Sequence, residues 1–466
     1  MRVRAGLRAA ATAILVLGGS VYGGDHDRRE LPPNAVQPPG ASFERTVSPP
    51  QWMLLLRETV HQTCAEIARE PVRSGVIGFA RLGERAGVRL AGGIPGSPVP
   101  PGHQCPEAGG PLTPARLTFL YESAPAYRAL LDLIASARCR IDFMIFGWGD
   151  DPAGRPVAAA LIERARAGVL VRVLIDRGGF VIGETNAHVV EGCPSFLDAL
   201  RSEPKLHLIE APDPAFRFDH RKVVVIDDRI VWTGSMILTR PSLERWHNCN
   251  FLAEGPIVPQ YAALFAERWE RLGGGRAGSC PDAATIEAVV PNAMVRMVRT
   301  EVDPPLRTLK EAVYGAVDAA QHHIYLENPY FDDQILIKKL VAARSRGVDV
   351  RAVLTMRGDV RTMNKFAAMT ANHLFRAGAR VYLYPAMTHV KAMSVDSTWV
   401  YIGTGNFDDL SLRGNREVSL TVRGPGIVRQ FEEDLFLRDM AASQELRALL
   451  PLPRGWLLLR GRWELY

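Results

Sequence analysis

Two histidines in this chain begin the same short pattern of residue types. The two copies, spaced as His-x-Lys-x4-Asp, are His220, Lys222 and Asp227 in the first half and His389, Lys391 and Asp396 in the second. On an extended strand, side chains two residues apart share a face, so each copy would present an imidazole beside an ammonium group. The residue between them, Arg221 or Val390, would face the other way.

Two such copies facing each other would surround a single phosphate with two imidazoles and two ammonium groups. The lysines would hold the nonbridging oxygens and stabilise charge in the transition state. One histidine would attack phosphorus to form a phosphohistidine, and the other would protonate the leaving alcohol and then activate the incoming one. The pattern therefore predicts phosphodiester chemistry that needs neither a metal nor a cofactor.

Other chemistries for these histidines fit the sequence less well. Zinc is disfavoured because no His or carboxylate follows either histidine by three or four residues, and lysine is not a usual zinc ligand. A P-loop is excluded because the pattern Gly-x4-Gly-Lys is absent.

The elements that must position the two patterns repeat as well. In each half we expect a helix, a strand, a second helix and a second strand, over 127–137, 140–146, 156–167 and 170–175, and again over 306–320, 323–327, 335–345 and 349–354. Strands that alternate with helices predict βαβ units with a parallel core. A repeat of this length predicts a duplicated domain.

Small residues follow each pattern at the same distance. The first is followed by Gly234 and Ser235, and the second by Gly403, Thr404, Gly405 and Asn406. A turn of small residues would leave room for a ligand, and its hydroxyl could donate to a phosphate oxygen.

With both patterns on a duplicated framework, the sequence resembles the phospholipase D superfamily over roughly residues 117–439. Within it, the sequence is most similar to bacterial cardiolipin synthases. The segments that carry this finer resemblance are 218–222, 254–256, 328–331, 405–408 and 415–417, together with expected helices over 260–272 and 428–437. The resemblance implies an α/β fold of two phospholipase D-type lobes, each a mixed sheet flanked by helices. A pseudo-twofold axis would relate the lobes, and the two patterns would meet at their interface.

The resemblance also implies roles for individual residues. The catalytic set would be His220, Lys222, Asp227, His389, Lys391 and Asp396, in which the two aspartates support local structure more than the reaction. Substrate-binding or supporting residues would be Ser235, Asn248, Thr404, Asn406 and Glu417. The family places its nucleophile in the first motif, which would be His220.

Two positions of the first half depart from the family pattern. Ile237 stands where the counterpart of Asn406 is expected, and Asn248 stands where the counterpart of Glu417 is expected. An amide accepts a hydrogen bond from imidazole but stabilises imidazolium less than a carboxylate does. Which histidine Glu417 orients stays open at this point, and with it the choice of nucleophile.

The N-terminal residues suggest an exported protein. Arg2, Arg4 and Arg8 precede an apolar run over 9–21 that is too short to span a bilayer comfortably. The expected division is a signal peptide over 1–24, a linker and accessory region over 25–115, lobe 1 over 116–285, lobe 2 over 286–440 and a tail over 441–466. We expect a periplasmic protein or one peripheral to the membrane, with no transmembrane domain. The tail over 451–466 resembles an interfacial segment, with ordinary packing as the alternative.

An even number of cysteines, six, permits disulfides in an exported chain. The pairs we expect are Cys64 with Cys105 and Cys249 with Cys280, the latter flanking a predicted helix. Free buried thiols are the alternative for the rest.

Composition fits a soluble globular protein, and its basic balance suggests an anionic partner such as phospholipid head groups or nucleic acid, with no acidic partner as the alternative. The chain has 466 residues, 47% hydrophobic and 23% charged, with a net charge of +6.

We expect a phosphatidyltransferase or phospholipase D that acts on phospholipid at a membrane surface. The alternative is a phosphodiesterase of the same superfamily acting on nucleic acid, which is disfavoured because aromatic and basic stretches for base stacking are not evident. A non-catalytic lipid-binding protein is disfavoured by the intact motifs. The acceptor alcohol (water, glycerol or phosphatidylglycerol), the head-group preference and the oligomeric state stay open.

Overall fold

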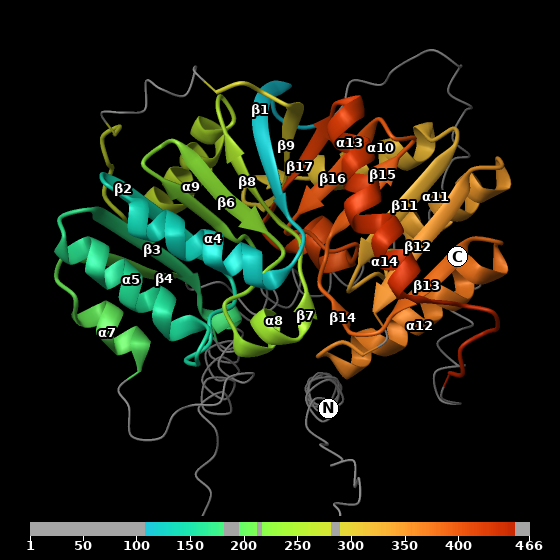
Figure 1. Cartoon of the computed structure of the whole chain (residues 1–466), viewed down its shortest axis with the longest axis horizontal. Coiled ribbons are helices and arrows are strands. Elements are labelled where there is room, and N and C mark those ends of the chain that lie inside the picture. Colours follow the sequence, from blue (N-terminus) through green and yellow to red (C-terminus); the bar gives the residue numbers. More distant parts are fainter. Residues whose placement is uncertain (1–107, 181–194, 212–216, 281–288, 356, 453–466) are drawn as a thin grey trace, which may run out of the picture. The chain divides into compact units, whose positions relative to one another are not determined.

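Two lobes with the same order of elements form the part of the chain that this computed structural model describes. The described residues are 108–180, 195–211, 217–280, 289–355 and 357–452. We call those up to 280 lobe 1 and those from 289 onward lobe 2 (Figure 1).

Lobe 1 begins with β1 and ends with α9. Its elements are β1 (Thr113–Leu120), α4 (Ser123–Ser136), β2 (Arg140–Ile145), α5 (Gly154–Arg166), β3 (Leu170–Asp176), α7 (Phe196–Ser202), β4 (Leu206–Ala211), β5 (Val223–Ile226), β6 (Ile230–Gly234), α8 (Arg240–Glu244), β7 (Trp246–His247), β8 (Asn250–Glu254) and α9 (Val258–Arg271).

Lobe 2 repeats the main order of these elements from β9 onward, with β10, β14, α14 and β18 in addition. Its elements are β9 (Ala293–Val302), β10 (Pro305–Leu306), α10 (Thr308–Ala319), β11 (His323–Asn328), α11 (Gln334–Ser345), β12 (Asp349–Thr355), α12 (Arg361–Arg376), β13 (Arg380–Tyr384), β14 (Met387–Thr388), β15 (Ala392–Val395), β16 (Trp399–Gly403), the π-helical turn η2 (Leu410–Gly414), β17 (Glu417–Arg423), α13 (Pro425–Phe431), the π-helical η3 (Glu432–Leu437), α14 (Arg438–Ala442) and β18 (Gln444–Glu445).

One mixed sheet runs through both lobes. Its order in lobe 1 is β4-β3-β2-β5-β6-β8-β1, and lobe 2 repeats it in reverse as β9-β17-β16-β15-β11-β12-β13, with β18 at the outer edge. Strands β2, β3 and β4 are parallel, as are β11, β12 and β13, and the other pairs are antiparallel. The lobes join where β1 pairs with β9 in antiparallel register. This order confirms the expected duplicated α/β fold, because the sheet repeats about the β1–β9 junction.

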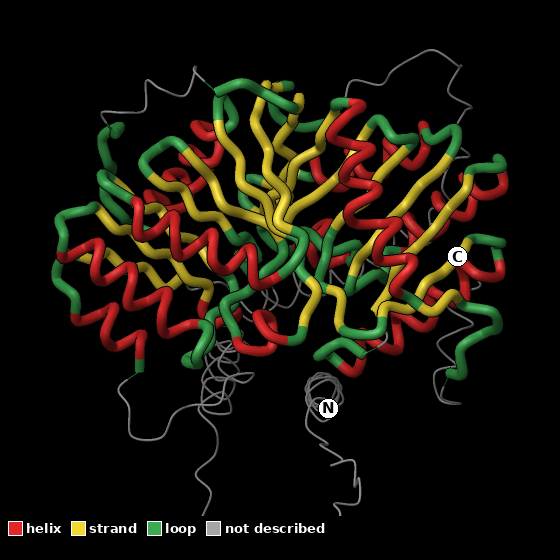
Figure 2. The backbone as a smooth tube through the Cα atoms, viewed as in Figure 1, coloured by secondary structure: helices red, strands yellow, loops and turns green. Residues whose placement is uncertain are grey.

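Helices cover both faces of the sheet (Figure 2). In lobe 1, one face packs against α4, α5 and α7, and in lobe 2 the matching face packs against α10, α11 and α12. The opposite faces pack against α9 and against α13 with η3, in one hydrophobic core that draws buried residues from both lobes. All six residues of β2 are buried, as expected for a strand covered on both faces.

Sequence periodicity predicted these elements correctly, but the expectation that the two His-x-Lys pairs lie on strands of the sheet is wrong. Each expected helix and strand of the two repeats is present, with ends shifted by a few residues. The His-x-Lys pairs, however, lie just before β5 and β15 rather than on them. The physical reason is that the backbone N–H of each histidine bonds to the other lobe instead of to a neighbouring strand of its own sheet.

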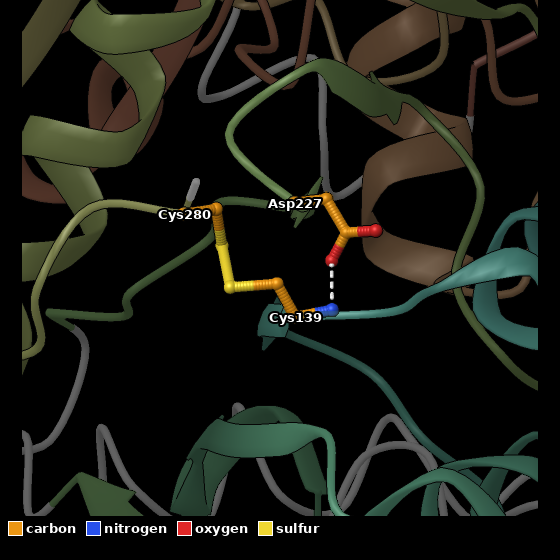
Figure 3. Close-up of side chains that lie close together, drawn as sticks. All are labelled: Cys139, Asp227 and Cys280. Carbon is orange, nitrogen blue, oxygen red and sulfur yellow. Dashed lines mark hydrogen bonds between the residues drawn. A yellow bond between two sulfur atoms is a disulfide. The ribbon is translucent and has the colours of Figure 1, made fainter. Parts of the chain in front are cut away.

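A disulfide joins Cys139, just before β2, to Cys280, beyond α9. The expected pairing of Cys249 with Cys280 is wrong, because Cys249 is a buried free thiol. Both bonded cysteines are held at the turn between β5 and β6. Asp227 accepts the backbone N–H of Cys139 at 2.8 Å (Figure 3). Asp228 accepts that of Cys280 at 3.1 Å.

Several expectations fall outside the described residues. These are the signal peptide over 1–24, the pair of Cys64 with Cys105, and most of the tail over 451–466. Strand β1 begins at Thr113, slightly before the expected start of lobe 1 at 116. Among the helices that the structure describes, none has the length and apolar character needed to cross a bilayer.

Candidate active site

Two short backbone bridges between the lobes place the motifs opposite each other. The N–H of His220 donates to the carbonyl of Arg416 at 3.0 Å, and that of His389 donates to the carbonyl of His247 at 2.7 Å. The second bridge belongs to the parallel pair of β7 and β14, which lie side by side in Figure 1. Each histidine is therefore anchored by the residue that precedes Asn248 or Glu417 in the other lobe.

Glu417 orients His220, the histidine of the first motif. The His220 Nδ1 atom lies 2.9 Å and 3.0 Å from the two carboxylate oxygens. The hydroxyls of Thr404 and Ser411 donate to the same carboxylate at 2.6 Å and 2.7 Å. Since an ionised carboxylate only accepts, Nδ1 carries the proton and Nε2 carries the lone pair.

Asn248 takes the equivalent position beside His389. Its Oδ1 atom lies 3.1 Å from His389 Nδ1 and accepts a hydrogen bond from the Ser235 hydroxyl at 2.9 Å. Its amide nitrogen donates to Ser123 Oγ at 3.0 Å and to the Ser242 carbonyl at 3.1 Å. These donations fix which way the amide points. The hydroxyls of Ser235 and Thr404, expected to face phosphate, instead hold the two groups that orient the histidines.

The two lysines are buried next to their histidines. Lys222 Nζ donates to the His220 carbonyl at 2.6 Å, and Lys391 Nζ donates to the His389 carbonyl at 2.7 Å. The Phe146 ring lies 4.5 Å from the His220 ring and 5.0 Å from Lys222 Nζ. A cation over an aromatic face is attracted to it. Phe146 was missed from the sequence because it lies before any motif, at the end of β2.

Burial and like charge dominate the electrostatics of the four groups. Burial lowers the pKa of His220 to about 4 against the opposing effect of Glu417, and it lowers the pKa of Lys222 to about 7. Burial also lowers the pKa of His389 well below its usual value, and Lys391, Lys222 and His220 lower it further. These mutual effects mean that both imidazoles and both ammonium groups share one site.

The carboxylate of Glu417 balances this positive charge. Burial alone would raise the pKa of Glu417, but His220 and Lys222 beside it hold the pKa below its usual value. A negative Glu417 beneath a neutral imidazole is the arrangement expected for an activated nucleophile.

Asp227 and Asp396 lie at the other end of the motif strands, away from the histidines. Asp227 accepts the backbone N–H groups of Arg138, Cys139 and Arg140, each at 2.8 Å. Asp396 accepts those of residues 321, 322 and 323, each also at 2.8 Å. Both aspartates have positive φ, 52° and 53°, which Asp tolerates better than most residues. Each aspartate therefore binds the turn of its motif hairpin to the backbone at the start of the neighbouring strand, β2 in lobe 1 and β11 in lobe 2.

Asn406 and Ile237 occupy the turns after β16 and β6. Asn406 is buried, and its Oδ1 atom has no hydrogen-bond partner among the described residues. Ile237 is also buried. The turn of lobe 2 therefore carries a buried polar amide, whereas the equivalent turn of lobe 1 carries an apolar side chain.

A buried cluster around His247 lies directly behind His389. The His247 ring nitrogens face Glu122 Oε2 at 3.1 Å and Asp439 Oδ2 at 2.7 Å, with Glu327 at 3.9 Å. Burial alone would lower the pKa of His247, but these hydrogen bonds raise it to about 10. His247, Glu327 and Asp439 offer ligand atoms within 4.8 Å of one another. The sequence did not indicate this grouping, because the three residues are far apart in the chain. Both ring nitrogens facing carboxylates fit an imidazolium ion pair.

Comparison with known proteins agrees with this geometry. The family described as "Cardiolipin synthase, PLD-like domain" matches residues 130–269 and 314–439, together more than half of the chain. The chain belongs to this family. Each matched segment contains one of the two motifs, so the match covers both halves of the site.

Individual relatives and solved structures extend this match. The chain is 28% identical to cardiolipin synthase A of Pseudomonas fluorescens (strain SBW25) over 338 residues, which cover 70% of this chain and 69% of the relative. It is 27% identical to cardiolipin synthase A of Klebsiella pneumoniae (strain 342) over 368 residues, which cover 75% and 73%. The crystal structure of phosphatidylserine synthase from Haemophilus influenzae Rd KW20 has the same fold, with a TM-score of 0.57 and 16% identity over 76% of this chain and 95% of that one.

Proposed function

We propose that the protein transfers the phosphatidyl group of a phospholipid to an alcohol through a phosphohistidine on His220. The observation that carries this proposal is the paired geometry of the site. Each imidazole is oriented through Nδ1 by a residue of the other lobe, and two buried ammonium groups lie beside them. The relatives named cardiolipin synthase support cardiolipin as the product. We propose phosphatidylglycerol as both donor and acceptor.

In the first half of the reaction, His220 Nε2 attacks phosphorus and the bond to the head-group alcohol breaks. Because burial holds the pKa of His220 at about 4, the imidazole is neutral and its lone pair is available. Lys222 and Lys391 stabilise the charge that develops on the nonbridging oxygens. In the second half, the acceptor oxygen displaces His220 from phosphorus.

His389 serves as the acid and then as the base. In the free enzyme, burial and the two lysines lower the pKa of His389. A bound phosphodiester brings negative charge between the lysines, which offsets their effect and favours the imidazolium form. Substrate therefore prepares the acid that protonates the leaving alcohol.

The choice of His220 as nucleophile is supported by the contact with Glu417. A carboxylate stabilises the positive charge that an imidazole gains when it bonds to phosphorus, and an amide stabilises that charge less. The family order of the motifs and the position of Glu417 therefore favour the same histidine. Nucleic acid as substrate is not favoured, because the matching relatives are cardiolipin synthases.

We also propose that the protein is exported and acts at a membrane surface. The disulfide between Cys139 and Cys280 supports an oxidising compartment, since such bonds are rare in a reducing cytosol. The basic and apolar start of the sequence supports export as well. Fractionation of the native host tests this, and a mature protein found only in the cytoplasm with Met1 intact would reject it.

The experiment that tests the reaction uses purified protein with phosphatidylglycerol, and separately with a bis-aryl phosphodiester and with DNA. We expect glycerol release and a diphosphatidyl product by mass spectrometry. With an aryl leaving group that needs no proton, His389→Ala should accumulate phosphoenzyme on His220, and His220→Ala should accumulate none. Label recovered on residue 389 would reverse the two roles.

A further inference from the structure

A cleft of about 430 Å3 opens between the lobes on the His389 side of the site. Lobe 1 contributes Arg245 and Trp246, at the end of α8 and in β7. Lobe 2 contributes Arg357 and Asp359, which precede α12, and Met387 in β14. No part of this cleft was identified from the sequence, since its walls come from segments more than a hundred residues apart.

The cleft adjoins the reacting groups. The Trp246 ring lies 5.0 Å from the His389 ring. Met387 pairs with Trp246 across β7 and β14, and its sulfur accepts the backbone N–H of Asp359 at 3.4 Å. Burial and Lys222 lower the pKa of Lys391, whereas Glu417 and then Asp359 counteract that effect, so Asp359 is close to Lys391 in space.

Two guanidinium groups in this cleft have their charge available. The side chains of Arg245 and Arg357 are exposed, and neither forms an ion pair with any residue that the structure describes. By contrast, Arg240 at the start of α8 pairs with Glu244 at 2.9 Å. The Asp359 carboxylate accepts a hydrogen bond from the Tyr330 hydroxyl. Burial raises the pKa of Asp359, and the Tyr330 hydroxyl and Lys391 oppose that effect. The cleft therefore presents two arginines suited to a phosphate.

The reaction itself tells which substrate part enters this cleft. The group that leaves and the group that later attacks both exchange a proton with His389, so both must lie on its side of phosphorus. A departing glycerol carries no charge that would need two arginines. An incoming phosphatidylglycerol carries a phosphodiester, separated from its attacking hydroxyl only by a three-carbon chain.

We propose that this cleft is the acceptor subsite and that Arg245 and Arg357 bind the phosphodiester of the incoming lipid. The inference rests on the proposed phosphatidyl transfer. In the step it serves, the terminal hydroxyl oxygen of the acceptor forms a bond to phosphorus. The bond between phosphorus and His220 Nε2 breaks, its electron pair returns to the imidazole, and the hydroxyl proton passes to His389. The arginines hold the acceptor in place for that attack and favour it over water.

A competition between acceptors tests the proposal. The donor is a short-chain phosphatidyl ester of p-nitrophenol, whose aryl group leaves without a proton. The acceptors are glycerol, which lacks a phosphate, and glycerophosphoglycerol, which has the phosphodiester but no acyl chains. A third arm with phosphatidylglycerol separates phosphate binding from acyl-chain binding. Mass spectrometry gives the ratio of the transfer products to the hydrolysis product.

We expect the wild-type protein to prefer glycerophosphoglycerol over glycerol. Arg245→Ala and Arg357→Ala should each reduce this preference by roughly tenfold to a hundredfold, the usual effect of losing one charge-assisted hydrogen bond. Arg245→Lys and Arg357→Lys should restore part of it. Arg240→Ala removes the arginine at the start of α8 and should leave the preference unchanged. Because the preference is a ratio of products from one sample, it does not depend on the folded fraction.

The outcomes separate this inference from the proposed function. If the wild-type protein transfers to alcohols but both alanine variants keep the preference, the arginines do not form the acceptor subsite. A preference seen only with phosphatidylglycerol would assign acceptor selection to the acyl chains and would also overturn the inference. If the wild-type protein releases no nitrophenol, or yields only the hydrolysis product with every alcohol, phosphatidyl transfer itself fails.

Discussion

Glu417 and Asn248 occupy equivalent positions in the two lobes, yet they give the two histidines different electrostatic environments. Glu417 places a negative charge 2.9 Å from His220 Nδ1, whereas Asn248 offers His389 only a carbonyl dipole. The carboxylate also favours the charged form of Lys222. A duplicated site has thus become asymmetric through one residue type, which suits a reaction whose two histidines do different work.

The pH dependence of kcat/KM should report this asymmetry. His220 must be neutral and Lys222 charged in the free enzyme, so kcat/KM should rise through about pH 4 and fall as the pH rises through about 7. Glu417→Gln should lower kcat/KM by roughly a hundredfold. It should also move the upper fall to lower pH, since the carboxylate raises the pKa of Lys222. Nitrophenol release from the aryl donor measures both.

Glu203→Gln provides the matched control, because it removes a buried carboxylate that pairs with Arg166 at the end of α5, outside the site. For this control, the rise and the fall of kcat/KM with pH should coincide with those of the wild-type protein. If Glu417→Gln lowers kcat/KM but leaves the pH of the rise and the pH of the fall unchanged, the carboxylate charge of Glu417 does not act on Lys222.

The two motif hairpins, β5 with β6 and β15 with β16, position the histidine and lysine side chains relative to the sheet. Each carries His and Lys at one end and the Asp of the motif at the other, so a shift of the hairpin would move the His and Lys side chains together. In lobe 1, the disulfide between Cys139 and Cys280 reinforces the contacts of Asp227. Asp396 holds the lobe 2 hairpin by three backbone hydrogen bonds, and neither of the two bonded cysteines lies beside it.

Removing the disulfide should therefore destabilise the protein. The bond closes a loop with a sequence separation of 141, for which a loss of roughly 2–5 kcal/mol is expected. We expect Cys139→Ser with Cys280→Ser to lower the unfolding temperature and to abolish its sensitivity to a reducing agent. Calorimetry with and without the reductant measures this. Cys249→Ala removes the free buried thiol and should keep the sensitivity, so its loss in that variant would contradict the pairing.

At the scale of the whole molecule, the ion cluster around His247 joins the lobes behind His389. His247 and Glu122 belong to lobe 1, whereas Asp439, Glu327 and Arg438 belong to lobe 2. Arg438 also reaches Glu122 at 3.1 Å. The backbone carbonyl of His247 also accepts the N–H of His389. The same residue therefore contributes both to the lobe interface and to the position of His389.

Stability should depend on pH through this histidine. Its pKa rises from 6.5 to about 10 on folding, so its stabilising effect is complete below about pH 6.5 and is lost as the pH rises toward 10. His247→Gln should cost a few kcal/mol at neutral pH, as removal of one partner of a buried ion pair does. It should also flatten the fall in unfolding temperature between pH 6.5 and 10.

His207→Gln makes the same change at an exposed position of β4 and serves as the control. It should reproduce the wild-type dependence of the unfolding temperature on pH. If His247→Gln keeps that dependence too, the imidazolium pair does not hold the lobes together.

The sequence by itself determined the duplicated α/β framework and the residues of both motifs. Helical and strand periodicity are local properties, and the spacing of His220 to Lys222 and of His389 to Lys391 repeats within matching elements. Such patterns can be read without knowing which segments meet. The same local reading failed for the disulfide, because proximity of two cysteines along the chain says little about proximity in space.

Tertiary structure alone decided which residues act across the lobes. Glu417 reaches the histidine of the other lobe rather than that of its own, and His247 gathers its carboxylates from both lobes. The cleft with Arg245 and Arg357 likewise exists only where β7 meets β14. These contacts depend on the register of the β1–β9 junction and of the short interlobe bridges, which is fixed by packing of the shared core and leaves no periodic trace in the sequence.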